Sequence, residues 1–112
     1  MSLIYHLVPA EYLHGLPTSE AYLPREFAQD GFIHCTKEPE VLLRVANQFY
    51  REVPGEMLVL VIDESKVTAQ VKYEPSAPEA HLFPHIYGPL NREAIVEIHS
   101  ARRALDGTFV AV

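Results

Sequence analysis

Met57-Leu58-Val59-Leu60-Val61-Ile62 is a run of six apolar residues that ends at Asp63. A run this short and this rich in Val and Leu predicts a β-strand that is covered on both faces, as strands are at the centre of a sheet. The rest of the chain must then supply neighbouring strands and the layers that pack against both faces of the sheet.

Five other short segments predict strands, because each is rich in β-forming residues and is bounded by Pro, Gly or polar residues. These segments are residues 3–8, 32–36, 71–73, 82–87 and 95–101. Across residues 94–104 a helix is the competing prediction. Residues 74–79, with Pro75 and Pro78, are predicted to form a loop, and Asp106-Gly107 a turn.

Residues 38–50 predict the longest helix of the chain. Their apolar residues follow the 3.6-residue period of an amphipathic helix, and Pro39 lies in the first turn, where proline is tolerated. Shorter helices are predicted at 9–13 and at 22–29, the second ending before Gly31. Because the sequence has no repeat and no linker, we predict one α+β domain over residues 1–112, in which strands outnumber long helices.

Composition argues against several classes of function. Hydrophobic residues make up 48% of the chain and charged residues 21%, the balance of a globular domain. Nine Lys and Arg face fifteen Asp and Glu without forming a basic stripe, which argues against a nucleic-acid partner. No apolar run approaches the ~20 residues of a membrane span, and the first residues carry no basic cluster. With Cys35 as the only cysteine, we expect a cytoplasmic protein without internal disulfides and without a membrane partner.

Two of the predicted strands carry the same kind of polar face, since alternate residues of a strand point to the same side. These faces are Phe32, His34 and Thr36 on one strand, and Phe83, His85 and Tyr87 on the other. The first strand adds His6, so that His6, His34 and His85 would meet if the three strands are neighbours. Aromatic rings beside imidazoles and hydroxyls suit a flat, polar small molecule, such as a base or a nicotinamide.

The same histidines have other interpretations. A histidine on an apolar strand is often a hydrogen-bonded core residue with no function at a site. His81 and His85 have the spacing of a helical metal-ligand pair, but Pro84 argues against a helix there, and in a strand the two side chains would be ~13 Å apart. A metal site would need His6, His34 and His85 to converge on one ion, and we predict no metal.

Three short stretches give the chain a family resemblance. They are Ile4-Tyr5-His6, Gly31-Phe32-Ile33-His34-Cys35-Thr36 and Phe83-Pro84-His85-Ile86-Tyr87-Gly88-Pro89-Leu90. With them the chain resembles the bacterial and plant family of domain of unknown function nine-fifty-two, from the first strand to the Asp106-Gly107 turn. That family is grouped by remote similarity with the ADP-ribosyltransferase-like fold, which implies a curved, mostly antiparallel, split β-sheet around a cleft for NAD.

The resemblance also implies roles for five residues. In the ADP-ribosyltransferase-like superfamily, side chains of the first two strands position NAD, and a later strand supplies a further functional side chain. By position, NAD would contact His6, His34, Thr36 and Tyr87, and the catalytic residues would be His85 and His34. Protein-modifying members place a glutamate where this chain has His85 or Tyr87, so a toxin-like activity is not implied.

These observations lead to two functions of different classes. The first is an NAD-utilising enzyme that transfers or hydrolyses ADP-ribose, with His85 as the acid or base because imidazole titrates near neutral pH. The second is a non-catalytic domain that binds a nucleotide-like small molecule or a protein partner in the same cleft. A third interpretation makes the histidines structural and places the function at another surface.

Overall fold

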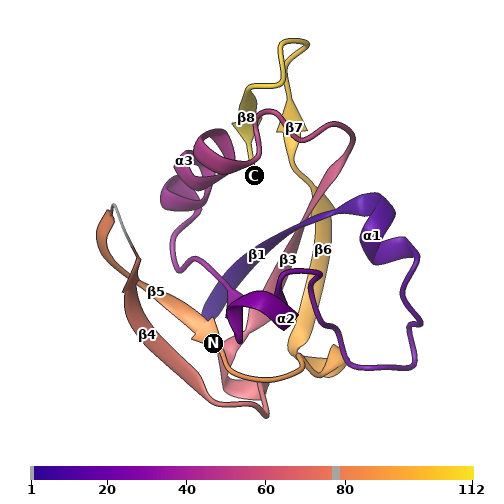
Figure 1. Ribbon diagram of the computed structural model, residues 1–112, viewed down its shortest axis with the longest axis vertical. Helices are drawn as coiled ribbons and strands as arrows, with labels where there is room; N and C mark the ends of the chain where they lie inside the picture. Colours follow the sequence, from indigo (N-terminus) through magenta and orange to yellow (C-terminus); the bar gives the residue numbers. More distant parts are fainter. Residues whose placement is uncertain (1, 77–78) are drawn as a thin grey trace.

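The central strand of the fold is β3 (Met57–Asp63). The computed structural model describes residues 2–76 and 79–112, and in it β3 lies in the middle of an antiparallel sheet of order β1-β3-β6 (Figure 1). β1 (Leu3–Pro9) pairs along one edge of β3, and β6 (Ile95–Ser100) pairs along the other. Every residue of β3 is buried, which confirms the prediction of a strand covered on both faces.

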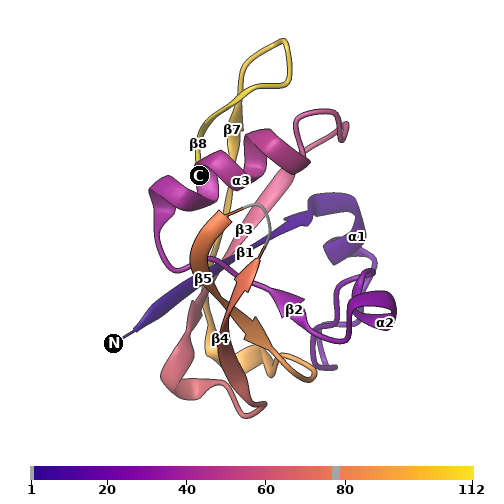
Figure 2. The same cartoon turned by 60° about the vertical axis from the view of Figure 1, so that its left-hand side comes forward.

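Alternation along β3 divides the hydrophobic core into two clusters. Leu58, Leu60 and Ile62 pack with α1 (Ala10–His14) and with the second sheet. Met57, Val59 and Val61 pack with α3 (Pro39–Phe49), the predicted amphipathic helix. Figures 1 and 2 show α3 between the β7–β8 hairpin and the β4–β5 hairpin. The first sheet is therefore covered by a helix on one side and by a second sheet on the other.

The second sheet is also antiparallel and has the order β2-β5-β4. Its strands are β2 (Ile33–His34), β5 (Glu79–Ile86) and β4 (Val71–Ser76). The loop predicted over 74–79 is wrong, because residues 74–76 continue β4 and β5 starts at residue 79, while residues 77–78 lie outside the described part of the chain. Pro75 fits into β4 because β4 is an edge strand, where one side of the backbone needs no partner.

A backbone bridge joins the two sheets. Tyr5 of β1 and Thr36, which follows β2, exchange two backbone hydrogen bonds with N to O distances of 2.8 Å each. β2 therefore lies between β1 and β5, and the three histidine-bearing strands are neighbours, as the sequence analysis required.

The ladder between β2 and β5 is short. It ends after the pair His34 and His85, and the next residue of β5 is Pro84, which has no N–H to donate. The Pro84 carbonyl oxygen still accepts a hydrogen bond from the Cys35 N–H at 3.0 Å. The chain then leaves β5, and Thr36 pairs with β1 instead.

Shorter elements complete the domain. They are α2 (Phe27–Asp30), the 3-10 turns η1 (Glu64–Lys66) and η2 (Arg92–Ala94), and a hairpin of β7 (Arg102–Arg103) and β8 (Phe109–Ala111). The helix predicted over 22–29 is reduced to α2, which ends at Gly31 with φ 81°. Residues 95–100 form β6, so the competing helix over 94–104 is wrong. In the described part of the chain, every helix falls short of the length and hydropathy of a membrane span.

We expect Leu60→Ala to lower the free energy of unfolding by about 2–5 kcal/mol, because a fully buried leucine at the sheet centre leaves a cavity. Ile98 of β6 pairs with Leu60 but is 47% exposed, so the control Ile98→Ala should cost less than about 1 kcal/mol. Urea unfolding followed by circular dichroism measures both changes. Equal losses would contradict the central position of β3.

Candidate functional site

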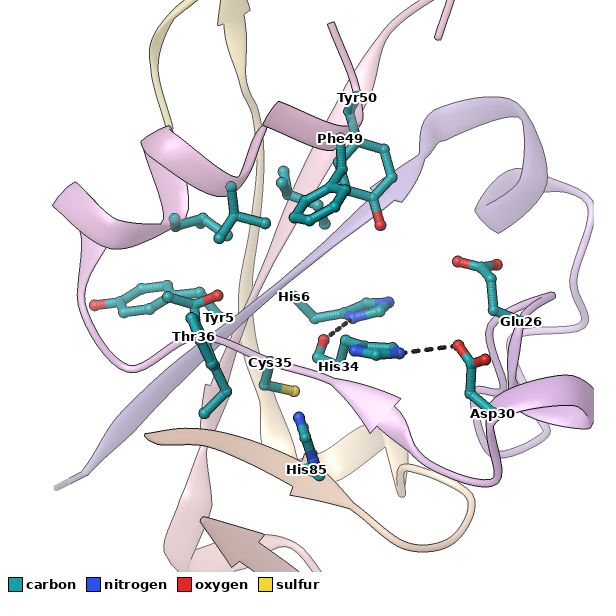
Figure 3. A pocket seen from close by; sticks show the side chains of 14 residues that line it. Tyr5, His6, Glu26, Asp30, His34, Cys35, Thr36, Phe49, Tyr50 and His85 are labelled. Atoms are coloured by element: carbon teal, nitrogen blue, oxygen red, sulfur yellow. Dashed lines mark hydrogen bonds and ion pairs between the residues drawn. The ribbon is translucent and has the colours of Figure 1, made fainter. Parts of the chain in front are cut away.

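A pocket of about 470 Å³ opens where β1 and β2 separate (Figure 3). This volume lies in the range of pockets that hold small molecules. The pocket lies between the three histidine-bearing strands, α3 and the segment of α2. Its polar lining consists of Tyr5, His6, Glu26, Asp30, His34, Cys35, Thr36, Tyr50 and His85, and its other lining side chains, such as Leu42, Phe49 and Phe83, are apolar.

His6 stabilises the opening between the two strands. Beyond the bridge to Thr36, the carbonyl oxygen of His34 accepts a hydrogen bond from Nδ1 of the His6 ring at 2.6 Å. A carbonyl oxygen can only accept, so Nδ1 carries the proton and Nε2 carries a lone pair. The Tyr22 hydroxyl donates to this Nε2 at 2.7 Å. Burial lowers the pKa of His6 to about 4, so the ring is neutral at physiological pH.

The expectation that His6 hydrogen-bonds a nucleotide needs correction. The residue is only 4% exposed, and both of its ring nitrogens have partners inside the protein. Although His6 borders the pocket, it has no free donor or acceptor for a ligand. We assign His6 a structural role, in which its ring links β1 to β2 through a hydrogen bond.

The predicted meeting of His34 and His85 is confirmed. The two residues are direct partners in the β2–β5 ladder, and their ring centroids are 5.5 Å apart. The His34 side chain is 51% exposed, with Nε2 2.9 Å from an oxygen of Asp30. The His85 side chain is 5% exposed, and its ring stacks on Phe32 at 4.1 Å. One imidazole therefore lies at the mouth of the pocket and the other lies inside.

His85 belongs to a chain of hydrogen bonds. Its Nδ1 donates to Glu74 Oε1 at 2.9 Å, and the Tyr87 hydroxyl donates to the same oxygen at 2.5 Å. The hydrogen bonds from Tyr87 and His85 lower the pKa of Glu74, and the bond to Glu74 raises the pKa of Tyr87. Because an ionised carboxylate only accepts, Nδ1 of His85 carries a proton, and in the neutral form of the ring this leaves the lone pair on Nε2.

The free nitrogen of His85 is the least expected feature of the site. Nε2 is buried and has no hydrogen-bond partner among the described residues. In Figure 3 the ring of His85 extends from β5 toward the pocket, below Cys35. Buried polar atoms are rarely left without a partner, and those that are often belong to catalytic or ligand-binding groups. This property singles out Nε2 as the candidate reactive atom of the site.

Thr36 and Tyr87 differ in their relation to the pocket. Thr36 is buried and lines the pocket, as predicted. Tyr87 is not among the lining residues, and its ring lies 5.3 Å from that of Phe32 and 4.9 Å from the Lys72 ammonium. The lining of the pocket therefore gives no support to the expected contact between Tyr87 and NAD. The Tyr87 hydroxyl donates a hydrogen bond to Glu74 instead.

The sequence analysis missed the carboxylates of the site. Glu74 lies in the segment predicted as a loop, although continued alternation from residue 72 would have placed it on the face of His85. Glu26 and Asp30 border the pocket from the segment of α2, and nothing in the sequence signalled that this segment faces β2. Within the described residues, no group of three or more His, Cys, Asp or Glu side chains is placed to hold a metal ion.

Comparison with known proteins agrees with the family resemblance. The family described as "Protein of unknown function (DUF952)" matches residues 7–98, which include β2, β5 and the pocket residues they carry. The chain belongs to this family. The match begins one residue after His6, so the Ile4-Tyr5-His6 stretch lies outside it. No curated protein matches this DUF952 chain.

Two similar solved structures belong to protein CC0527 from Caulobacter crescentus. Its X-ray structure has a TM-score of 0.81 at 21% sequence identity, covering 96% of the DUF952 chain and 92% of CC0527. Its solution NMR structure has a TM-score of 0.75 at 23% identity, covering 96% and 90% of the two chains. At these identities the likeness shows that the two proteins share a fold.

Acid should destabilise this DUF952 domain through His6. The pKa of His6 is about 4 in the folded state and 6.5 ordinarily, so between these pH values the unfolded state binds more protons. The contribution should amount to about 3 kcal/mol of lost unfolding free energy between pH 6.5 and pH 4. Denaturant unfolding across this pH range measures the loss.

His6→Asn removes the titrating ring, so the pH dependence of its stability should be flatter by this amount. The variant will also be less stable at pH 7, because the Tyr22 hydroxyl loses its acceptor. His14→Asn, at an exposed histidine, should keep the full pH dependence. If His6→Asn also kept it, burial of a neutral His6 would be ruled out as the cause.

Proposed function

We propose that the pocket is the active site of an NAD-utilising enzyme that hydrolyses or transfers ADP-ribose. The observation that carries the proposal is the buried Nε2 of His85, a residue that lines the pocket, because this atom has no hydrogen-bond partner in the described part of the chain. The family resemblance supplies the substrate, since it assigns NAD to the cleft between the strands that carry His34, Thr36 and His85. The kinship with the ADP-ribosyltransferase-like fold belongs to the same proposal, and the split between β1 and β2 supports it.

The surroundings of His85 suit a general base. Glu74 fixes the tautomer that leaves Nε2 free, and its negative charge stabilises the imidazolium that forms when Nε2 takes a proton. Phe32 holds the plane of the ring by stacking on it. Tyr87 in turn holds Glu74. The ring therefore needs little rearrangement to receive a proton.

In the proposed hydrolysis, the bond between ribose C1′ and the nicotinamide nitrogen breaks, and its electron pair remains on nicotinamide, which leaves as a neutral molecule. The oxygen of water bonds to C1′, and one water proton passes to His85 Nε2. The products are ADP-ribose, nicotinamide and one proton. In the transfer reaction, a hydroxyl group of an acceptor takes the place of water.

The other residues of the pocket would position the substrate. The apolar side chains of α3 and Phe83 would form an apolar surface against which a flat ring can pack. His34, whose ring pairs with Asp30 at the mouth, and the Thr36 hydroxyl would contact the polar part of the ligand. Both residues thus keep the orienting role that the sequence analysis gave them.

The direct test is incubation with NAD and chromatographic detection of released nicotinamide. His85→Gln should lower the rate by about 10²–10⁴-fold, as loss of a general base does. The matched control is His99→Gln, which removes a histidine that also pairs with a carboxylate, Glu97, at 2.7 Å, but lies outside the pocket. Melting temperatures verify that each variant is folded. Equal rates for the wild-type protein and His85→Gln would contradict the assignment of His85 as the general base.

Glu74→Gln tests the positioning role of the carboxylate. We expect kcat to fall by about tenfold or more, because the imidazolium loses a charged partner. KM for NAD should stay close to its wild-type value, because Glu74 is not among the residues that line the pocket, whereas a purely structural change would alter both constants. Glu97→Gln should leave both constants at their wild-type values.

Binding of NAD without release of nicotinamide would instead support the second function, a non-catalytic domain for a nucleotide-like molecule. Absence of both binding and release would reject NAD as the ligand.

A further inference from the structure

We propose that the pocket selects an organic cation, whose charged group binds at the α2 end between the carboxylates of Glu26 and Asp30 and the aromatic rings of Phe49 and Tyr50. This inference uses the proposed active site only as the location of binding. It adds the chemical class of the substrate, which the fold and the family leave open.

The charges that border the pocket favour a cation. Neither Lys nor Arg is among the described lining residues, whereas Glu26 and Asp30 both are. The two carboxylates lie one helical turn apart, since the Asp30 N–H donates to the Glu26 carbonyl at 2.9 Å. Figure 3 shows them together at one end of the pocket. Asp30 pairs with His34, while Glu26 makes no salt bridge among the described residues.

Two aromatic rings line the pocket above His6 in Figure 3, and the Tyr50 hydroxyl lies on the side of Glu26 and Asp30. Tyr50 is half-buried and Phe49 is 58% exposed, and both come from the C-terminal end of α3. Burial, and then the negative charges of Glu26 and Asp30, raise the pKa of the Tyr50 hydroxyl, so the carboxylates act on this ring. Carboxylates combined with aromatic faces attract organic cations, because the ring faces carry negative electrostatic potential.

The inner end of the pocket provides an independent argument. His85 Nε2 is buried without a partner among the described residues, and in the tautomer that donates from Nδ1 to Glu74 it accepts a hydrogen bond. It adds a third acceptor to the two carboxylates of the pocket. An anionic group would be repelled here, while a cation or a donor-rich group would be stabilised. In NAD the matching part is the positively charged nicotinamide ring.

Three small compounds test the inference by isothermal titration calorimetry. 1-Methylnicotinamide carries the positive charge, nicotinamide has the same ring without it, and 6-methylnicotinamide has the extra methyl group but no charge. We expect the cation to bind at least about tenfold more tightly than either neutral compound, with a preference that weakens as salt is added.

The double variant Glu26→Gln and Asp30→Asn should abolish this preference while it still binds the neutral compounds. Glu97→Gln, which removes a carboxylate of β6 outside the pocket, should keep the preference. Equal binding of the three compounds, no binding of the cation, or a preference that survives in the double variant would each overturn the inference.

These outcomes are separable from those of the NAD assay. Hydrolysis of NAD without a preference for the cation would leave the proposed function standing and reject the selection by charge. A preference for the cation without hydrolysis would leave the selection standing and reject NAD as the substrate.

Discussion

The hydrogen bond from His6 Nδ1 to the His34 carbonyl oxygen is the interaction on which the site depends. At 2.6 Å, it satisfies a backbone acceptor of β2 with a side chain of β1. The two strands can therefore separate past the bridge between Tyr5 and Thr36 without leaving this partly buried acceptor unpaired, which would be costly. The pocket forms in the opening that results. Tyr22 completes the arrangement by donating to the other nitrogen of His6.

A proline has the matching role on the other side of β2. Pro84 cannot donate to Cys35, so the β2–β5 ladder ends at the pair His34 and His85. The two histidines of that pair share the face of the sheet that borders the opening. His6 and His85 thus illustrate two states of the same side chain. The first is buried with both nitrogens satisfied, and the second is buried with one nitrogen satisfied by Glu74 and the other without a partner among the residues that the structure describes.

Local patterns predicted the parts of this structure that depend on local physics. The apolar run of β3 and the helical period of α3 were sufficient because burial alone determines both elements, and alternation placed His34 and His85 on one face. The roles of His6 and Tyr87 were not predictable, since they depend on Tyr22 and Glu74, which lie 16 and 13 residues away in the sequence. The strand position of Glu74 was not predicted, because Pro75 follows it in the sequence. A proline within a strand is tolerated only on an edge strand, and the edge position depends on the whole sheet.

Charge balance connects the proposed base with the proposed preference for a cation. A proton that arrives on His85 Nε2 creates a positive charge in a buried site, which is unfavourable when nothing compensates it. A substrate that enters as a cation and loses its charge when its bond breaks provides that compensation. The positive charge leaves the ring as the proton reaches the imidazole, so the total charge of the pocket stays constant during the reaction. Glu74, Glu26 and Asp30 then face one positive charge at every stage, and none of them has to change its ionisation.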